Sequence, residues 1–162
     1  MKDYIVCSFS GGKDSTAMVL RMIELGEHID EVVCCDTYKE FPAMYRHIDK
    51  VRKIIEEHGI KFIMLRSEKS FDYYMFEHKV KTTQTHDIGY GWSTPKVRWC
   101  TRALKVDITE KYINQLKKQY NLIQCLGLAY DEQYRLERKN NQEKGKRFPL
   151  VEWKWEEKDA LK

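Results

Sequence analysis

Short apolar runs and longer amphipathic stretches alternate along this chain. Four apolar runs have the length of buried strands, and they lie at residues 4–9, 31–35, 61–65 and 122–126. Apolar residues recur at helical spacing in three stretches, at residues 14–25, 42–59 and 103–120. Alternation of strands with helices predicts a parallel sheet with right-handed crossovers. We therefore expect an α/β fold, a three-layer α/β/α sandwich around a mostly parallel sheet.

The remaining segments are shorter or less regular. We expect a short helix over 71–80, an irregular segment over 81–98, a helix that begins near Tyr130 and a short fifth strand over 148–151. A long irregular segment in a compact domain is usually functional or mobile. The 162 residues have the size of one domain, so we treat 1–162 as a single domain.

The sequence Ser-Gly-Gly-Lys-Asp-Ser at residues 10–15 follows the first predicted strand and opens the first predicted helix. The two glycines allow a tight turn and a close approach to a ligand. The helix start offers unpaired N–H groups and the positive end of the helix dipole, so we expect a phosphate site. The motif is not the common P-loop, because Asp14 rather than Ser or Thr follows Lys13. Asp14 either caps the helix or holds a magnesium ion beside the phosphates.

Segments that follow the predicted strands should meet at one edge of the sheet, where open parallel sheets bind their ligands. These segments are 10–15, 36–37 and 127–132. Asp36 could accept a hydrogen bond from a ribose hydroxyl or an adenine amine, or it could cap the next helix. Asp131 and Glu132 could hold a metal, orient Arg135 or cap a helix of their own.

Charge and composition narrow the class of protein. Apolar residues make up 42% of the chain and charged residues 33%, which is typical of soluble globular proteins. No apolar run approaches the roughly 20 residues of a membrane span, and the N-terminus lacks a signal-peptide layout, so we expect a cytoplasmic protein. The net charge of +4 suits an anionic nucleotide but does not by itself indicate nucleic-acid binding. The basic segment 139–147 is either a contact surface or a solvated loop.

The five cysteines form no Cys-x-x-Cys pair, and the histidines lack metal-ligand spacing, so we expect neither disulfides nor a zinc site. Cys100 lies outside the predicted strands, near a helix start and two arginines, an environment that favours a reactive thiolate. It is a candidate catalytic or redox thiol, with interior packing as the alternative. Arg98 and Arg102, together with Lys105, form either a second anion site or a solvated basic face.

The motif at 10–15 resembles the PP-loop of the ATP pyrophosphatase superfamily. Residues 36–42, Asp-Thr-Tyr-Lys-Glu-Phe-Pro, resemble the Asp-Thr-Gly-x-Glu-Phe-Pro segment of the PAPS (3′-phosphoadenylyl sulfate) reductase family, with Tyr38 at the glycine position. This substitution puts the geometry of that turn in question, because a tyrosine does not adopt glycine conformations readily.

Two later segments extend the resemblance over most of the chain. Residues 100–105, Cys-Thr-Arg-Ala-Leu-Lys, are similar to the family's Cys-Thr-x-x-Leu-Lys element. Residues 127–132 resemble its Gly-x-x-x-Asp-Glu element, with Arg135 or Arg138 as the arginine that follows. The resemblance implies the adenine nucleotide alpha hydrolase-like form of the α/β fold.

Carried onto this sequence, the resemblance implies three kinds of site residue. The nucleotide would be bound by Ser8, Ser10, Gly11, Gly12, Lys13, Asp14, Ser15, Asp36, Thr37 and Gly127. The distal anion would be held by Arg98, Arg102, Lys105, Arg135 and Arg138. The catalytic residues would be Lys13, Asp14 and Cys100, with Asp14 as a magnesium ligand.

The resemblance implies binding of ATP or a sulfonucleotide and leaves three functions open. In a reductase, a thiol attacks the sulfur of PAPS and sulfite is released, which requires a thiol reductant such as a thioredoxin-like protein. In an ATP pyrophosphatase or adenylyltransferase, an oxyanion attacks the α-phosphate of ATP and pyrophosphate leaves. In the third, the chain is a nucleotide-binding subunit that works with a partner in nucleic-acid sulfur modification. A homodimer is a further alternative.

The chain departs from the family's reductases at two places. Reductases with an iron–sulfur cluster carry a Cys-Cys pair and a later Cys-x-x-Cys, whereas here Trp99 precedes Cys100 and no cysteine follows Cys125. We therefore expect no iron–sulfur cluster. The family's reductases also use a cysteine in a C-terminal tail, which we expect this domain to lack because the sequence stops at Lys162.

Overall fold

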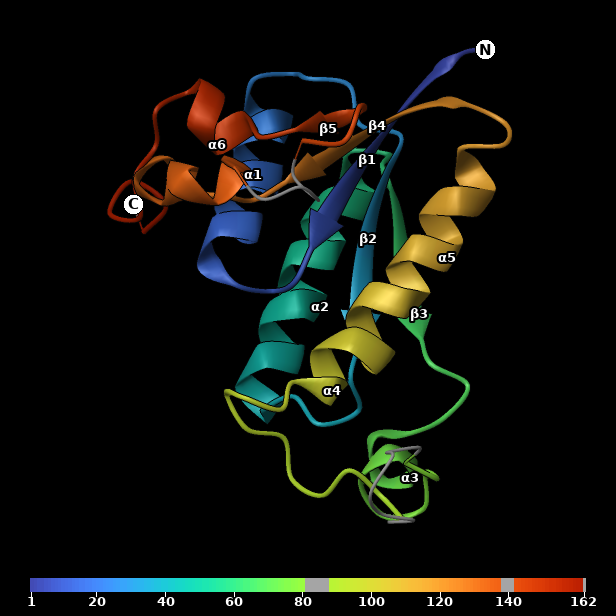
Figure 1. Cartoon of the computed structure of the whole chain (residues 1–162). Helices are drawn as coiled ribbons and strands as arrows, with labels where there is room; N and C mark the ends of the chain where they lie inside the picture. The colour runs from blue at the N-terminus through green and yellow to red at the C-terminus, as the bar shows by residue number, and fades with distance from the viewer. Residues whose placement is uncertain (81–87, 138–141, 162) are drawn as a thin grey trace.

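The computed structural model describes residues 1–80, 88–137 and 142–161. Five strands form one sheet: β1 (Asp3–Phe9), β2 (Glu31–Asp36), β3 (Lys61–Arg66), β4 (Asn121–Leu126) and β5 (Lys146–Arg147). They lie in the order β3-β2-β1-β4-β5, and every neighbouring pair is parallel. The expected α/β fold with a parallel sheet is confirmed, and the four strands predicted from apolar runs are all present (Figure 1).

The helices lie between the strands along the chain. They are α1 (Lys13–Glu24), α2 (Pro42–Glu57), α3 (Phe71–Phe76), α4 (Trp99–Thr101), α5 (Asp107–Leu116) and α6 (Pro149–Glu152). A π-helical segment, Arg102–Val106, joins α4 to α5, and a 3-10 helix spans Tyr130–Glu137. The helix predicted over 103–120 therefore starts earlier, at α4, and contains a π-helical turn.

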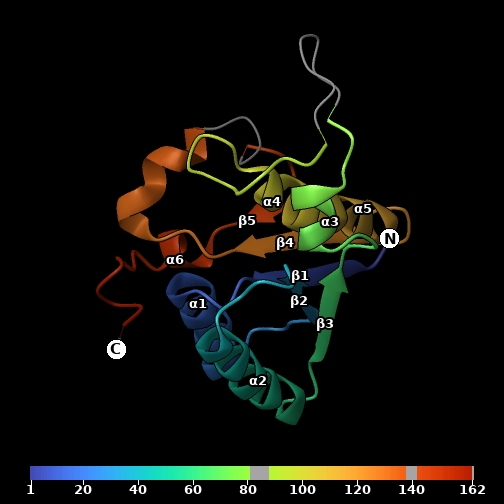
Figure 2. The same cartoon turned by 90° about the horizontal axis from the view of Figure 1, so that it is seen from below.

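Helices cover both faces of the sheet, which gives the three expected layers. Seen from below, α1 and α2 lie on one side of the strands and α5 lies on the other (Figure 2). On the first side, Met22 and Ile55 belong to the larger apolar core. On the second side, Ile113 packs with Val6 and Leu122. Both faces of the central strand β1 are thus buried, as its continuous apolar run predicts.

One predicted strand is wrong. Residues 149–152 form α6, with Pro149 in the first turn, and the fifth strand consists of Lys146 and Arg147. Proline is well suited to a helix start, because its missing N–H is not needed there. Among the described residues, no helix is long and apolar enough to cross a membrane.

Candidate functional site

The turn between β1 and α1 has a fixed geometry. Gly11 has a positive φ of 76°, and Gly12, the N-cap of α1, has an extended backbone with φ −77°. The Ser10 N–H donates to the Ser15 hydroxyl at 3.2 Å, and this hydroxyl donates to the Gly12 carbonyl at 3.0 Å. The first helical bond runs from the Thr16 N–H to the Gly12 carbonyl at 3.0 Å. The N–H groups of residues 13–15 precede that bond, so the turn presents helix-start donors as an anion site requires.

Gly127 brings the end of β4 against this turn. A Cβ atom at Gly127 would lie 2.8 Å from both the backbone nitrogen and the Cα of Ser15. No side chain fits there, so β4 and the start of α1 are in direct backbone contact. The prediction that residues 10–15 and 127–132 meet at the carboxyl edge of the sheet is confirmed by this contact.

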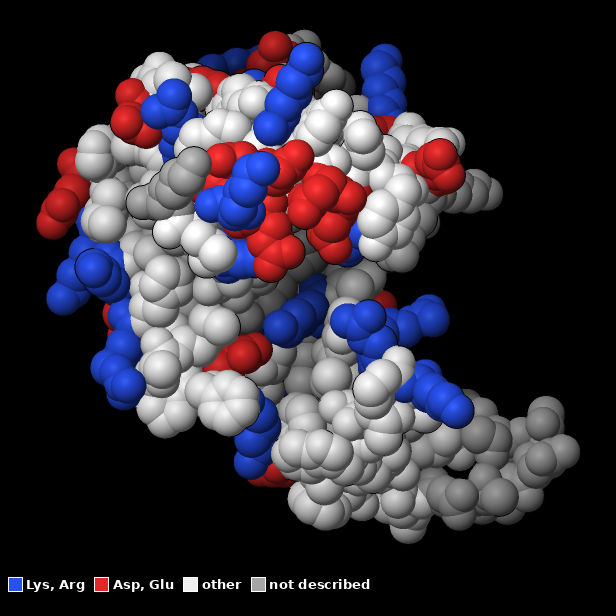
Figure 3. Space-filling view, turned by 90° about the vertical axis from the view of Figure 1, so that its left-hand side faces the viewer, with Lys and Arg blue, Asp and Glu red and all other residues white. Residues whose placement is uncertain are grey.

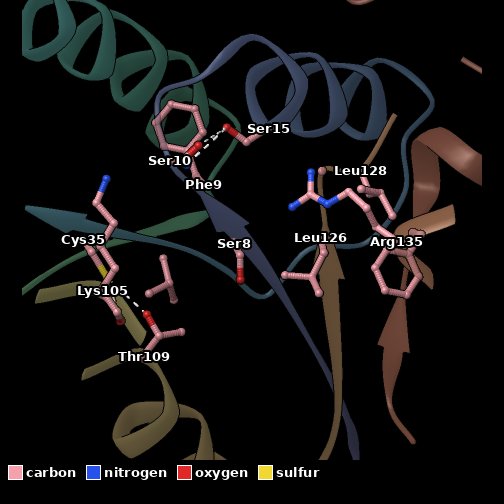
Figure 4. Close-up of a pocket in the computed structure, with 13 residues that line it drawn as sticks. Ser8, Phe9, Ser10, Ser15, Cys35, Lys105, Thr109, Leu126, Leu128 and Arg135 are labelled. Atoms are coloured by element: carbon pink, nitrogen blue, oxygen red, sulfur yellow. Dashed lines mark hydrogen bonds between the residues drawn. The ribbon is translucent and has the colours of Figure 1, made fainter. Parts of the chain in front are cut away.

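A cavity of about 360 Å³ opens at this edge. Its lining consists of Ser8, Phe9, Ser10, Ser15, Val33, Cys35, Lys105, Thr109, Leu126, Gly127, Leu128, Arg135 and Phe148. Six of these residues are among the predicted site residues, namely Ser8, Ser10, Ser15, Lys105, Gly127 and Arg135. Figure 4 shows Lys105 and Arg135 on opposite sides of the space, with the serines of the turn between them. The cavity therefore combines two cations, four hydroxyls and apolar walls.

Lys105 is held in place by acidic and hydroxyl partners. Its Nζ lies 3.3 Å from Oε1 of Glu40, and the same oxygen accepts from the Thr37 hydroxyl at 2.9 Å. Thr37 is buried and Glu40 partly buried, so the lysine is anchored by a network rather than by one exposed pair. Thr37, a predicted nucleotide contact, does not line the cavity. It contacts Glu40, which in turn contacts the cavity residue Lys105.

Asp36 organises the turn after β2. Its Oδ1 accepts from the Tyr38 N–H and the Tyr45 hydroxyl, both at 2.8 Å, and its Oδ2 from Arg66 Nε at 3.0 Å. Burial raises the pKa of this carboxyl, but the three donors outweigh that effect and hold the pKa below its usual value. Asp36 does not cap α2, whose N-cap is Phe41.

Tyr38 adopts the conformation that glycine would have. Its φ is +67°, and its hydroxyl donates to the Ser67 carbonyl at 2.6 Å. The turn of the Asp-Thr-Gly pattern is therefore preserved with a tyrosine in the left-handed region, which is uncommon for a large side chain.

Lys13 and Asp14 precede Ser15 in the turn but do not line the cavity. Lys13 Nζ is 2.5 Å from Glu157 and 3.7 Å from Asp14, and the bond to Glu157 raises the lysine pKa. Partial burial raises the pKa of Asp14, Lys13 lowers it, and the nearby carboxylates of Asp131, Glu132 and Glu157 raise it further. Figure 3 shows acidic side chains gathered above a hollow in the surface, with basic side chains below it.

Among the described residues, no three Cys, His, Asp or Glu side chains converge as metal ligands would. One oxygen of Asp14 is buried without a hydrogen-bond partner in the described structure. Asp14 is thus a single carboxylate at the phosphate turn, and its role as a magnesium ligand stays a prediction.

The predicted arginine pair is placed elsewhere. Arg98 and Arg102 line a different cavity, together with Thr101, Val106, Asp107 and Glu110. Cys100 packs with the apolar cluster around Phe71, Trp99 and Leu104 and does not line the nucleotide cavity. Arg138 lies outside the described residues. Within residues 98–105, Lys105 lines the nucleotide cavity, whereas Arg98, Thr101 and Arg102 line the other one.

Cys35 and Thr109 are cavity residues that sequence reasoning missed. The Cys35 sulfur lies 3.1 Å from the Thr109 hydroxyl and 3.8 Å from the Lys105 carbonyl. Burial raises the pKa of the Cys35 thiol, against a smaller lowering by Thr109 and Lys105. The one available signal was position, because Cys35 directly precedes Asp36 at the carboxyl end of a predicted strand.

A solved structure shares this fold. The U34-tRNA thiolase NcsA from Methanococcus maripaludis aligns with 98% of this chain and 55% of its own, at a TM-score of 0.52 and 18% identity. That structure contains a [4Fe-4S] cluster. The expectation of no iron–sulfur cluster is therefore corrected. Cysteine spacing in this one domain was too narrow a basis for it, since a protein of the same fold carries a cluster.

The sequence comparisons give the family. An uncharacterized protein of Methanocaldococcus jannaschii is 34% identical over 116 residues, which cover 71% of this chain and 21% of that protein. The chain thus spans about a fifth of that relative and about half of the thiolase. The phosphoadenosine phosphosulfate reductase domain matches residues 4–159. Because this match takes in both the turn between β1 and α1 and the 3-10 helix beyond β4, the protein belongs to the PAPS reductase family.

Proposed function

We propose that this chain binds an adenine nucleotide in the cavity and transfers its adenylyl group to an acceptor, with ATP as the donor. The observation that carries the proposal is the juxtaposition of the Ser10–Ser15 turn with Lys105 and Arg135 around one partly apolar space. Apolar walls suit a base and ribose, while helix-start N–H groups and two cations suit a phosphate chain.

The reaction needs charge stabilisation more than a protein nucleophile. An acceptor oxygen attacks the α-phosphorus of ATP, a new P–O bond forms, and the bond to the bridging oxygen of pyrophosphate breaks. The acceptor proton passes to solvent, and the negative charge of the leaving pyrophosphate grows. Cations fixed before the reaction stabilise that charge without reorganisation. Lys105 meets this condition, because Glu40 already holds it in place.

Sulfonucleotide reduction is the second candidate, and the family match supports it. It would begin with attack of a thiolate on the sulfur of PAPS, which forms an S–S bond and expels the nucleotide. A second thiol, from a thioredoxin-like reductant, would then release sulfite and leave a disulfide. Cys35 is the one cysteine in the cavity lining, and burial raises its pKa, which disfavours the thiolate. Adenylyl transfer is therefore the first choice.

The test is calorimetric titration with ATP plus magnesium, PAPS and AMP, together with an assay of pyrophosphate release. We expect ATP to bind most tightly, and Gly12→Val to weaken binding at least tenfold without loss of folding. Valine fits the extended backbone of Gly12, but its side chain would stand where phosphate must approach. Unchanged affinity in folded Gly12→Val would contradict the phosphate site. Tight binding of PAPS alone would favour the reductase.

A second set of variants tests the cations. Lys105→Met should remove a charge-assisted hydrogen bond of about 1.5–3 kcal/mol, a loss of roughly ten- to hundredfold for ATP and little for AMP. Arg98→Ala and Arg102→Ala are the matched controls, because both line the other cavity. Equal losses in all three variants would show that the effect is general charge rather than a specific contact.

A further inference from the structure

An aromatic cluster projects beyond the carboxyl edge of the sheet, where α3 and α4 lie (Figure 1). His78, Tyr90 and Trp99 stack in sequence, with ring centroids 4.9 and 5.7 Å apart and interplanar angles of 25° and 16°. Phe71 packs on Trp99 at 4.7 Å and extends the cluster toward Trp92, whose ring is 5.8 Å away. The cluster continues to the surface, because Trp92 is 67% exposed.

Hydrogen bonds hold the segment that carries Trp92, residues 91–99, in a closed loop. The Trp99 indole donates to the Gly91 carbonyl at 3.1 Å, which ties the two ends of the segment together. Inside it, the Thr94 N–H donates to the Val97 carbonyl, and the Val97 N–H donates to the Thr94 hydroxyl, both at 3.1 Å. An exposed tryptophan on a fixed support loses little conformational entropy when it binds a partner.

Basic side chains accompany this tryptophan. Lys96 and Arg98 lie on the same closed segment, and Arg102 follows on the adjoining helix with its side chain 84% exposed. Within residues 1–80, 88–137 and 142–161, no ion pair is found for Lys96 or Arg98. We refer to Trp92, Lys96, Arg98 and Arg102 as the Trp92 face. It combines an exposed ring with cations, one of which has only a long contact to Asp107, at 3.8 Å.

The basic segment predicted over 139–147 differs from the Trp92 face in how its cations are paired. In its described part, Arg147 contacts Glu152 through two nitrogens and also contacts Glu27, while Lys146 pairs with Glu143 at 3.1 Å. Arg147 and Lys146 are thus already neutralised by the protein's own carboxylates. The Trp92 face is therefore the better place for an anionic partner.

We propose that the Trp92 face binds single-stranded RNA, with an unpaired base stacked on Trp92 and neighbouring phosphates at Lys96, Arg98 and Arg102. Exposed aromatic rings and cations together match the two features of a single strand, its π faces and its charged backbone. A duplex hides its base faces, and cellular RNA presents unpaired bases in loops and ends. This proposal is independent of adenylyl transfer, since binding requires no nucleotide in the cavity.

The position of the face gives it access to the candidate reaction site. Arg102 and Val106 line the cavity beside the face, whereas Lys105 and Thr109 line the nucleotide cavity. A single helical stretch therefore separates the two spaces. A strand held on the Trp92 face would need to cross only this stretch to bring a base or sugar to the nucleotide.

The experiment measures fluorescence anisotropy of labelled oligouridylate with the protein alone, over a series of salt concentrations. We expect Trp92→Leu to weaken binding at least fivefold and Trp92→Phe to restore it, because the ring provides the stacking. Arg98→Ala should lower the slope of log affinity against log salt by about 0.7, the value for one phosphate contact on a single strand. Lys53→Ala, on α2, is the matched control and should change neither quantity.

Each other outcome would overturn the proposal. Wild-type protein that fails to bind oligouridylate at low salt removes the surface as an RNA site. Equal binding of duplex would assign the affinity to charge alone, and equal binding of oligodeoxythymidylate would assign the surface to single strands in general rather than to RNA. Full binding by Trp92→Leu, or an equal effect of Lys53→Ala, would likewise assign the affinity to charge alone. Thermal melting of each variant confirms that it is folded, which is expected because Trp92 is mostly exposed.

Discussion

At the scale of single residues, the turn after β2 shows how a side chain replaces a missing glycine. Tyr38 occupies the left-handed region, which costs a non-glycine residue roughly 1–2 kcal/mol. Two interactions offset this cost, the N–H bond to Asp36 and the hydroxyl bond to Ser67. The sequence alone could not predict that the turn is preserved with tyrosine at this position. The hydrogen-bond partner of Tyr38, Ser67, lies 29 residues away, and a local sequence pattern does not indicate such a contact.

Asp36 should make stability depend on acid pH. Its pKa in the folded protein lies below the ordinary value of 3.8, so the unfolded chain binds protons first as the pH falls. The stabilisation is present above pH 4 and is lost as the pH drops through the folded pKa. Urea unfolding should therefore show that the stability difference between wild type and Asp36→Asn shrinks from pH 6 to pH 3. A difference that stays constant over this range would contradict the assignment.

At the scale of elements, local pattern was sufficient for the long elements and for the short helix α3, and it failed for the fifth strand. Strands such as β1 and β4 could be predicted because burial on both faces requires continuous apolar runs. β5 could not, since Lys146 and Arg147 form a polar edge strand defined only by pairing with β4. The same limit applies to the site. Which of Arg102 and Lys105 faces the nucleotide cavity depends on the orientation of a helix, and the sequence does not state it.

The contact between β4 and α1 is the element-level feature with the clearest test. Gly127→Ala should destabilise the protein by about 1–3 kcal/mol, because the new methyl group would overlap the backbone of Ser15. It should also weaken nucleotide binding, since the start of α1 must shift. Gly12→Ala is the control for stability, as its methyl group meets nothing closer than 3.4 Å. Equal unfolding free energies for the two variants would show that the chain relaxes at Gly127.

At the scale of the whole molecule, a fully buried carboxylate at the first residue of β2 joins several elements. Glu31 is 0% exposed, and its Oε2 accepts from the hydroxyls of Tyr4 and Tyr112, both at 3.1 Å. Lys61 lies 3.4 Å from the same oxygen. These partners come from β1, α5 and β3, so one side chain joins three elements that are distant in sequence.

Removal of one donor to Glu31 should therefore be costly. We expect Tyr112→Phe to lower the free energy of unfolding by about 1–3 kcal/mol, because it leaves a buried carboxylate under-satisfied. Tyr120→Phe is the matched control, since Tyr120 stacks on the ring of Tyr4 but is not a hydrogen-bond partner of Glu31 in the described part of the chain. Burial and Glu31 also raise the pKa of Tyr4 to about 12. This tyrosine stays neutral in the folded protein while it ionises in the unfolded chain, so stability should fall as pH rises from 10 to 12.

The strand order has a consequence for the time course of folding. The central strand β1 pairs with β2, which follows it closely in the sequence, and with β4, which follows much later. In the second pairing Cys7 lies opposite Cys125. During synthesis the first three strands and two helices can assemble while β4 is still untranslated. The edge of β1 that later pairs with β4 then has unpaired backbone N–H and C=O groups. Because β1 is rich in apolar residues, this edge can pair with strands of other chains. Slower elongation through residues 67–120 should lengthen that exposure and lower the soluble yield, whereas faster synthesis of this stretch should raise it.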